Sequence, residues 1–264
     1  TSTPQQRQNI YPPVIEDSLD RQQAAQKAWK DLLTEWRLPE TKFDAMPVLN
    51  TPRALPPELA GRINLNAKLI QPDRFGEIEL KEALRIFIER SGGLLCGEDK
   101  NTAPSLQSLS LTSFAGEGAS KAKNESQFYR VVFTQVSYPF QIAEGYGELR
   151  FLIARNGDLL QWSSSLIPNV SLPTRAEIKT QTISEKLSGR EFSYTTIAGR
   201  PQSYKVTKQQ EIKVGELVIY PKLDSNQIKL HLAFPVVVGQ GMTWTVYIDA
   251  INGEEIAVKQ NFAS

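Results

Sequence analysis

Three carboxylates surround the dipeptide Asn252-Gly253 near the end of the chain and raise the question of whether they bind a metal ion. Asp249 precedes the dipeptide, and Glu254 and Glu255 follow it. A calcium-binding loop of the EF-hand type needs oxygen ligands at alternate positions and a glycine at its sixth position. Counted from Asp249, Gly253 is the fifth residue and Glu254 the sixth, so the pattern fails. We therefore predict that these acids flank a β-turn, where they keep a sheet edge soluble or accept hydrogen bonds from nearby backbone amides.

A second Asn-Gly dipeptide, Asn156-Gly157, lies between the alternating stretches LRFLIA and DLLQW. Asn-Gly between alternating apolar residues is the strongest short-range hairpin signal, because both turn positions favour a positive φ. An aromatic residue stands five positions before each asparagine, Phe151 in one case and Tyr247 in the other. We predict that both dipeptides, Asn156-Gly157 and Asn252-Gly253, are hairpin turns at equivalent places in two halves of the chain.

Nucleophilic and histidine chemistry has few candidates, because His231 is the single histidine and Cys96 the single cysteine. In the stretch IKLHLAF the apolar residues alternate, so His231 is expected on the opposite face of its strand. That face is either solvated or a second packed face. The distance between Cys96 and His231 in the sequence does not exclude that they form a nucleophile pair in the fold. One histidine cannot complete an HExxH zinc site, and the glycine-rich stretches fit neither a serine-hydrolase motif nor a phosphate loop. We predict a protein that is not an enzyme, with no catalytic, metal-binding or cofactor-binding residues and no cofactor.

Composition excludes several other classes. The 264 residues carry a formal net charge of +1, and no dense Lys/Arg block is present, so no nucleic-acid partner is expected. The apolar runs are far shorter than the ~20 residues that cross a bilayer, which predicts no membrane span. A single cysteine rules out an intrachain disulfide.

Three helices are expected. The first follows Asp17 or Ser18 as its cap, and its apolar stripe is expected in the core, with docking to another protein as the alternative. The second runs from about Ile78 to Glu89 and ends at Ser91-Gly92-Gly93. The third covers residues 175–189, with Thr174 as a candidate cap. The stripe of the first helix consists of Ala25, Trp29, Leu32 and Trp36.

Strands follow the second and the third helix. The stretches FYRVVFTQV, GELRFLIA and DLLQWSSSL alternate with period two, and six further strand-like stretches follow from residue 192. The order of a helix and then antiparallel strands occurs twice, in residues 77–166 and 173–262. Segregated helices and strands indicate an α+β fold. We predict an N-terminal helix and Pro-rich connector in residues 1–74, followed by two repeated helix-plus-antiparallel-sheet units in residues 75–168 and 169–264.

The second unit resembles the PepSY domain, in which an aromatic-led strand ends in Asp-Ala before a glycine turn and an acidic residue. The first unit resembles FTP, the propeptide segment found before fungalysin- and thermolysin-type metallopeptidases. One departure is Tyr138-Pro139, which stands where FTP usually has Asn-Gly. Another is that the peptidase is absent, since the sequence stops at KQNFAS. The matching positions are Trp244, Tyr247, Asp249, Ala250, Gly253 and Glu254 for PepSY, and Gln135, Ile142, Gly145, Asn156 and Gly157 for FTP.

The resemblance implies a cystatin-like pairing of a helix with a curled antiparallel sheet in each unit. It also implies binding rather than turnover, because these propeptides inhibit their peptidase and assist its folding. The leading hypothesis is a non-catalytic, exported, propeptide-like protein that binds a secreted or envelope zinc metallopeptidase as inhibitor or folding assistant. The residues TSTPQQRQNI hold no signal segment, which processing or truncation would have removed. The residues expected to support partner binding are Trp244, Tyr247, Asp249 and Phe262.

The alternative hypothesis is a ligand-binding or scaffold module on the same fold, without peptidase-related activity. A deep apolar pocket between helix and sheet favours this alternative. A filled core with an exposed strand edge favours inhibition, since an extended partner can pair with such an edge.

Overall fold

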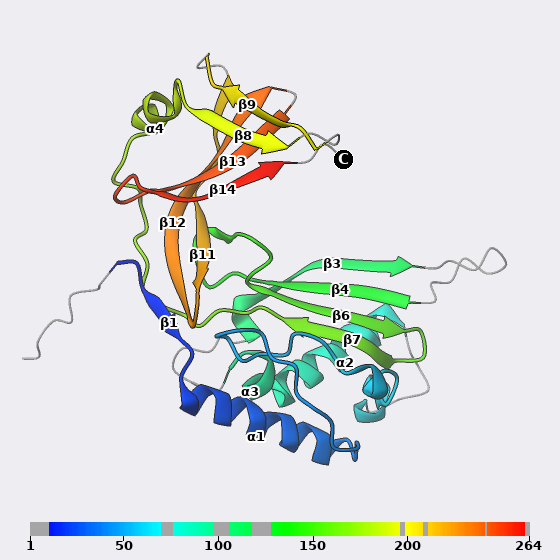
Figure 1. The fold of residues 1–264 in the computed structure, drawn as a ribbon. Coiled ribbons are helices and arrows are strands. Elements are labelled where there is room, and N and C mark those ends of the chain that lie inside the picture. Colours follow the sequence, from blue (N-terminus) through cyan, green and yellow to red (C-terminus); the bar gives the residue numbers. More distant parts are fainter. Residues whose placement is uncertain are drawn as a thin grey trace, which may run out of the picture.

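The computed structural model describes residues 11–69, 76–97, 106–117, 128–195, 199–207, 211–240 and 242–261. These residues form two larger sheets, a separate two-stranded hairpin and a small number of helices (Figure 1). Helices and strands are segregated along the chain, which agrees with the predicted α+β class. That the two units are repeats of one another stays a prediction.

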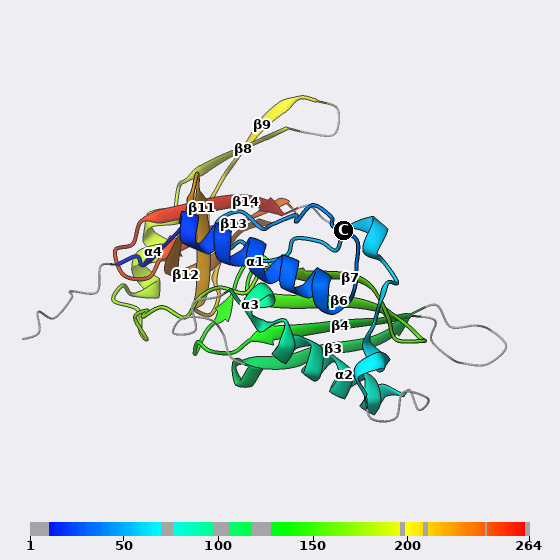
Figure 2. The ribbon, with the colours of Figure 1, turned by 90° about the horizontal axis from the view of Figure 1, so that it is seen from below.

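The first sheet has five antiparallel strands in the order β2-β7-β6-β4-β3. One face of this sheet packs on the helices, which lie in front of the strands in Figure 2. The helices are α1 (Leu19–Glu35), α2 (Glu77–Arg90) and α3 (Gly92–Leu95). The strands are β2 (Ile63–Asn64), β3 (Leu109–Glu117), β4 (Phe128–Gln135), β6 (Glu148–Ala154) and β7 (Asp158–Ser164).

Two of the predicted helices are confirmed. Ser18 caps α1 by accepting a hydrogen bond from the backbone N–H of Arg21, and the predicted stripe packs in the core as expected, with Trp36 half-buried at the end of the helix. Helix α2 also lies where predicted, and Glu79 accepts a hydrogen bond from the N–H of Gly76 at its start. The glycine pair beyond α2 does not end the helical region, because Gly92 begins the short helix α3.

The third helix is shorter than predicted. Helix α4 covers Thr180–Leu187 and is preceded by Lys179 as its cap, so Thr174 as the cap is wrong. The backbone N–H groups of Glu177 and Ile178 donate to the carbonyl oxygen of Ala250. These bonds hold the segment before α4 against the distant turn after β13. The helix therefore begins later than predicted.

The second sheet is built around the long strand β12 (Gln227–Gln240). Its first part pairs with β11 (Val218–Asp224) on one side and with β1 (Val14–Glu16) on the other. Its last part pairs with β10 (Ile212–Val214) and with β13 (Met242–Asp249) on those same sides. Strand β14 (Glu255–Asn261) then continues the sheet beyond β13.

Both sheets draw strands across the predicted unit boundaries. Strand β5 (Gln141–Ile142) pairs in parallel with β11, although it lies within the first unit by sequence. Strand β1 comes from the N-terminal region and joins the second sheet, whereas α1 directly after it packs on the first core. The three-part division of the chain stays a prediction about sequence units.

The second core lies between its sheet and a cover made of α4 and a hairpin. The hairpin strands are β8 (Glu191–Thr195) and β9 (Pro201–Lys205). Ile183 and Leu187 of α4 and Phe192 of β8 pack on the face that carries Trp244 and Val246. In the described part of the chain, no helix is both long and apolar enough to cross a membrane.

Candidate functional site

The two Asn-Gly dipeptides lie at hairpin ends, as predicted. Asn156-Gly157 connects β6 to β7, and Asn252-Gly253 connects β13 to β14. Only the glycines have positive φ, +88° for Gly157 and +75° for Gly253, so the expectation of positive φ at both positions is wrong. The loops span residues 155–157 and 250–254, longer than a two-residue turn, and such loops need a single left-handed residue near their end.

Asp249 is the centre of a buried polar cluster where β13 ends. The carboxylate is 1% exposed. Its Oδ2 accepts hydrogen bonds from the Tyr11 hydroxyl (2.9 Å) and from Nδ1 of His231 (2.7 Å). Its Oδ1 accepts from the backbone N–H groups of Ile251 (2.8 Å) and Asn252 (3.2 Å). The predicted bonding to backbone amides is confirmed, whereas the role of keeping an edge soluble is wrong for Asp249, because the side chain is buried.

His231 lies on the second face of its strand, as predicted, and is largely buried there, with 13% of its side chain exposed. Its strand partner across the sheet is Tyr220, and its ring lies perpendicular to the Tyr11 ring at a centroid distance of 6.2 Å. The ionised Asp249 has no proton to donate, so Nδ1 of His231 carries the hydrogen of their bond. Nε2 is buried and has no hydrogen-bond partner within the described residues.

The Tyr11 side chain takes the place of a backbone hydrogen-bonding partner along β12. On this side of β12, strand β1 ends its pairing at Lys229 and β13 begins at Ala233. Between them the Tyr11 hydroxyl accepts from the N–H of Leu232 at 3.0 Å and donates to Asp249. The side chain thus closes a gap in the sheet edge and joins the N-terminal segment to the turn after β13.

Opposing effects act on the pKa of Asp249. Burial favours the neutral acid and so acts to raise the pKa. The hydrogen bonds from His231, from the backbone of Ile251 and Asn252 and from Tyr11 stabilise the ionised form. Together they outweigh burial, and the pKa lies below its ordinary value.

This lowered pKa predicts an acid-sensitive contribution to stability. The contribution is fully present above the pKa of an unfolded aspartate, about 3.9, and is lost as the pH falls through the lower folded value. We expect the free energy of unfolding to fall more between pH 5 and pH 2 in the natural chain than in the variant Asp249→Asn. Urea unfolding followed by circular dichroism across this range measures both slopes. Equal pH dependence of the two free energies would show that ionised Asp249 does not stabilise the fold.

The other residues predicted to support partner binding are held inside the fold or lie outside the described residues. Trp244 is 2% exposed and stacks on Phe192 at 5.0 Å. Tyr247 packs against Tyr220 with ring centroids 4.3 Å apart and donates its hydroxyl hydrogen to Glu144 at 2.7 Å. Phe262 lies outside the described residues. Trp244 and Tyr247 therefore position β13 and the turn after it.

Cys96 and His231 belong to different environments. Cys96 packs in the core of the first sheet, where burial raises the pKa of its thiol to about 11. A nucleophilic cysteine needs the opposite shift. Within the described ranges no hydrogen bond joins Cys96 to His231, whose Nδ1 bonds Asp249 instead. The described residues also contain no group of three or more His, Cys, Asp or Glu side chains that could hold a metal ion.

The outer edge of β14 is the second feature that bears on function. In the strand order of the second sheet, β14 is the terminal strand next to β13. The bulge beside Ile248 shifts the register, and from Ala257 to Asn261 the pairing with β13 is regular. Val258 on this strand is 39% exposed. An edge strand presents alternate backbone N–H and C=O groups to any strand that can pair with it.

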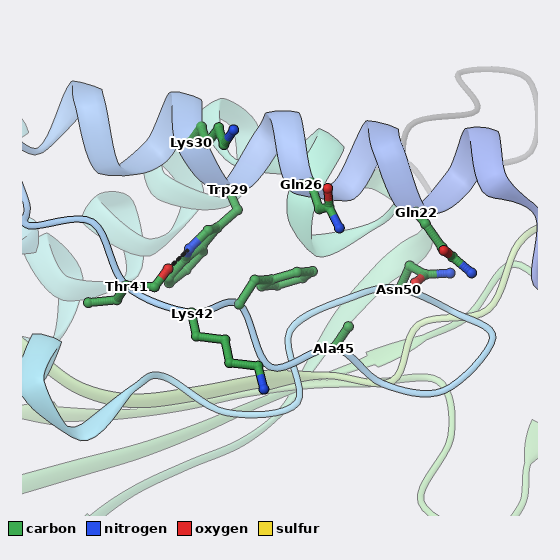
Figure 3. Close-up of a pocket in the computed structure, with 9 residues that line it drawn as sticks. Gln22, Gln26, Trp29, Lys30, Thr41, Lys42, Ala45 and Asn50 are labelled. Carbon is green, nitrogen blue, oxygen red and sulfur yellow. Dashed lines mark hydrogen bonds between the residues drawn. The ribbon is translucent and has the colours of Figure 1, made fainter.

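A groove lies between α1 and the loop of residues 41–50 (Figure 3). It has a volume of about 350 Å³. The α1 side carries Gln22, Gln26 and Lys30, and the loop side carries Lys42 and Asn50. The groove was not predicted from the sequence, since its two walls come from a helix and an irregular connector.

Comparison with solved structures gives a loose likeness and nothing stronger. No protein-family model matches the chain, and no curated protein matches it. A solved structure of the Bacillus megaterium YpeB C-terminal domain is similar over 72% of this chain and 67% of that chain, at 12% identity and a TM-score of 0.30. A likeness at this level carries no conclusion, so the resemblance to PepSY and FTP segments stays a prediction.

Proposed function

We propose that this chain is a non-catalytic, exported, propeptide-like protein that binds a secreted or envelope metallopeptidase through the outer edge of β14. The bound strand would inhibit the peptidase or assist its folding. The observation that supports this proposal is the position of β14, which ends its sheet with a regular stretch from Ala257 to Asn261. Backbone pairing at such an edge provides affinity, and alternate side chains provide specificity.

Both cores are filled with side chains, which favours a partner that pairs with the sheet edge over a ligand that binds between helix and sheet. In the first core Leu84 of α2 and Ile153 of β6 are fully buried, and in the second core Leu187 of α4 and Val246 of β13 are fully buried as well. Side chains therefore occupy the space where a deep apolar pocket would lie.

Trp244, Tyr247 and Asp249 support this function indirectly. Trp244 anchors β13 to the second core, and Tyr247 and Asp249 fix the strand and its turn through Glu144 and His231. A rigid neighbouring strand keeps β14 extended, so less conformational entropy is lost when a partner binds. These residues thus hold the strand that presents the edge.

A titration of the purified chain into a thermolysin-type peptidase tests the proposal. Residual peptidase activity and cleavage of the chain are read together. We expect stoichiometric loss of activity while the chain stays intact. Undiminished activity of several such peptidases, or rapid degradation of the chain, would count against the proposal.

Two proline variants at consecutive positions locate the binding edge. In a regular edge strand, neighbouring N–H groups point alternately toward the sheet and toward solvent. Of Val258→Pro and Lys259→Pro, one therefore removes a bond to β13 and lowers Tm, whereas the other removes an outward N–H and is tolerated by the fold. We expect the variant that keeps its Tm to lose inhibition at least tenfold. Full inhibition by that variant would exclude the β14 edge.

A further inference from the structure

We propose that the groove between α1 and residues 41–50 binds a small anion with a planar ring, such as an aromatic carboxylate. The site is independent of the β14 edge, because it lies on the first sheet's helical layer (Figures 1 and 3). Three features of the described residues support it: an aromatic floor, polar side chains without protein partners, and two lysines outside any ion pair.

The floor of the groove is a fixed pair of aromatic rings. Phe43 stacks on Trp29 with centroids 5.4 Å apart and planes inclined by 29°. Nε1 of Trp29 donates to the carbonyl oxygen of Thr41 at 3.0 Å, which holds the indole and the loop together (Figure 3). Phe43 is partly exposed, so one ring of the pair is available to a planar ligand.

The walls carry polar groups that lack protein partners. Gln22 and Gln26 stand one turn apart on α1, and both extend toward the loop in Figure 3. Neither side-chain amide has a hydrogen bond to any residue in the described ranges. Gln22 is half-buried and Gln26 is exposed, so both side-chain amides are free to bond a ligand, and their NH₂ groups can donate to its oxygen atoms.

The charge of the groove favours an anion. Lys30 on α1 and Lys42 on the loop line opposite walls, and neither forms an ion pair with a described residue. Elsewhere on the surface, lysines such as Lys68 and Lys81 are paired with glutamates. No carboxylate lines the groove, and Asp17 beside it accepts a hydrogen bond from Asn50 at 2.8 Å. Both lysines are exposed and flexible, so their ammonium groups can turn toward a ligand carboxylate, although in Figure 3 Lys30 lies along α1 and Lys42 extends away from it.

The volume limits the size of the ligand. About 350 Å³ is near the lower end of the range for small-molecule pockets. One or two fused rings with a single acidic group fit such a space, whereas a folded partner does not. We therefore chose 2-naphthoate as the probe and 2-naphthamide as its neutral match.

Calorimetric titration of the full chain with 2-naphthoate at low salt tests the inference. We expect saturable binding at one site, and at least fivefold weaker binding of 2-naphthamide. The double variant Lys30→Gln/Lys42→Gln should weaken naphthoate about tenfold, the loss expected when two exposed ion pairs are removed. Lys27→Gln is the matched control, because Lys27 is exposed on α1 but does not line the groove.

Three outcomes of this titration would overturn the inference. They are no saturable binding up to millimolar naphthoate, equal affinity for the amide, and equal loss in the control variant. The substituted lysines are exposed, so the variants are expected to fold, and circular dichroism verifies this. Ala45→Trp, which fills the groove from the loop side, should abolish binding, and unchanged binding in that variant would place the probe elsewhere.

Discussion

Replacing Asp249 with alanine is expected to lower the free energy of unfolding by about 3–5 kcal/mol, among the largest effects of any single substitution in this chain. The carboxylate is 1% exposed and accepts hydrogen bonds from two side chains and two backbone amides. Alanine leaves all four donors without that acceptor. Each buried donor that loses its partner costs roughly 1–3 kcal/mol, although relaxation and water entry reduce the sum.

Chemical denaturation at pH 7 measures this loss. Glu254→Ala is the matched control, because Glu254 also flanks the turn but is exposed. The control is expected to change the free energy of unfolding by less than about 1 kcal/mol. A loss below about 1.5 kcal/mol in Asp249→Ala would show that the cluster does not stabilise the fold through hydrogen bonds to Asp249.

The variant Asp249→Asn separates charge from hydrogen bonding. Its amide oxygen still accepts the N–H groups of Ile251 and Asn252, but its NH₂ group cannot accept from His231 or Tyr11. We expect an intermediate loss of about 1–3 kcal/mol. If Asn and Ala were equally destabilising, the turn amides would contribute little, and the bonds to His231 and Tyr11 would carry the effect.

Local features of the fold could be predicted from the sequence because their signals are local. The cap at Ser18, the stripe from Ala25 to Leu32 and the strands on either side of Asn156-Gly157 all depend on residues within one or two turns of each other. Hydrogen-bonded helices and hairpins satisfy their backbones internally, so periodicity and turn residues indicate them directly.

The candidate site could be predicted only in part, since it depends on distant pairing. The Tyr11 hydroxyl bonds Asp249 across 238 positions of sequence, and nothing near Tyr11 indicates a strand on the edge of β12. The burial of Asp249 follows from that docking. The late start of α4 has the same kind of cause, because Glu177 and Ile178 bond the carbonyl of the distant Ala250.

The two Asn-Gly turns look equivalent in the sequence, but their glycines are expected to differ in tolerance. Both have positive φ, which costs an alanine roughly 1–2 kcal/mol. At Gly157 a Cβ would lie only 2.5 Å from Oδ1 of Asn66, whereas at Gly253 the nearest atom is Cγ2 of Ile178 at 3.7 Å. Gly157→Ala should therefore lower the free energy of unfolding by about 2–4 kcal/mol, and Gly253→Ala by only about 1–2 kcal/mol.

This pair of variants isolates the steric contribution, because the backbone strain is common to both. Asn66 is 7% exposed, and its Nδ2 donates to the carbonyl oxygen of Asn156, so the side chain cannot move aside without losing that bond. Urea unfolding of the two variants at one pH gives the difference directly. Equal losses would mean that Asn66 yields at little cost. In that case the two turns would be alike in energy as well as in sequence, as the repeat predicted from the sequence implies.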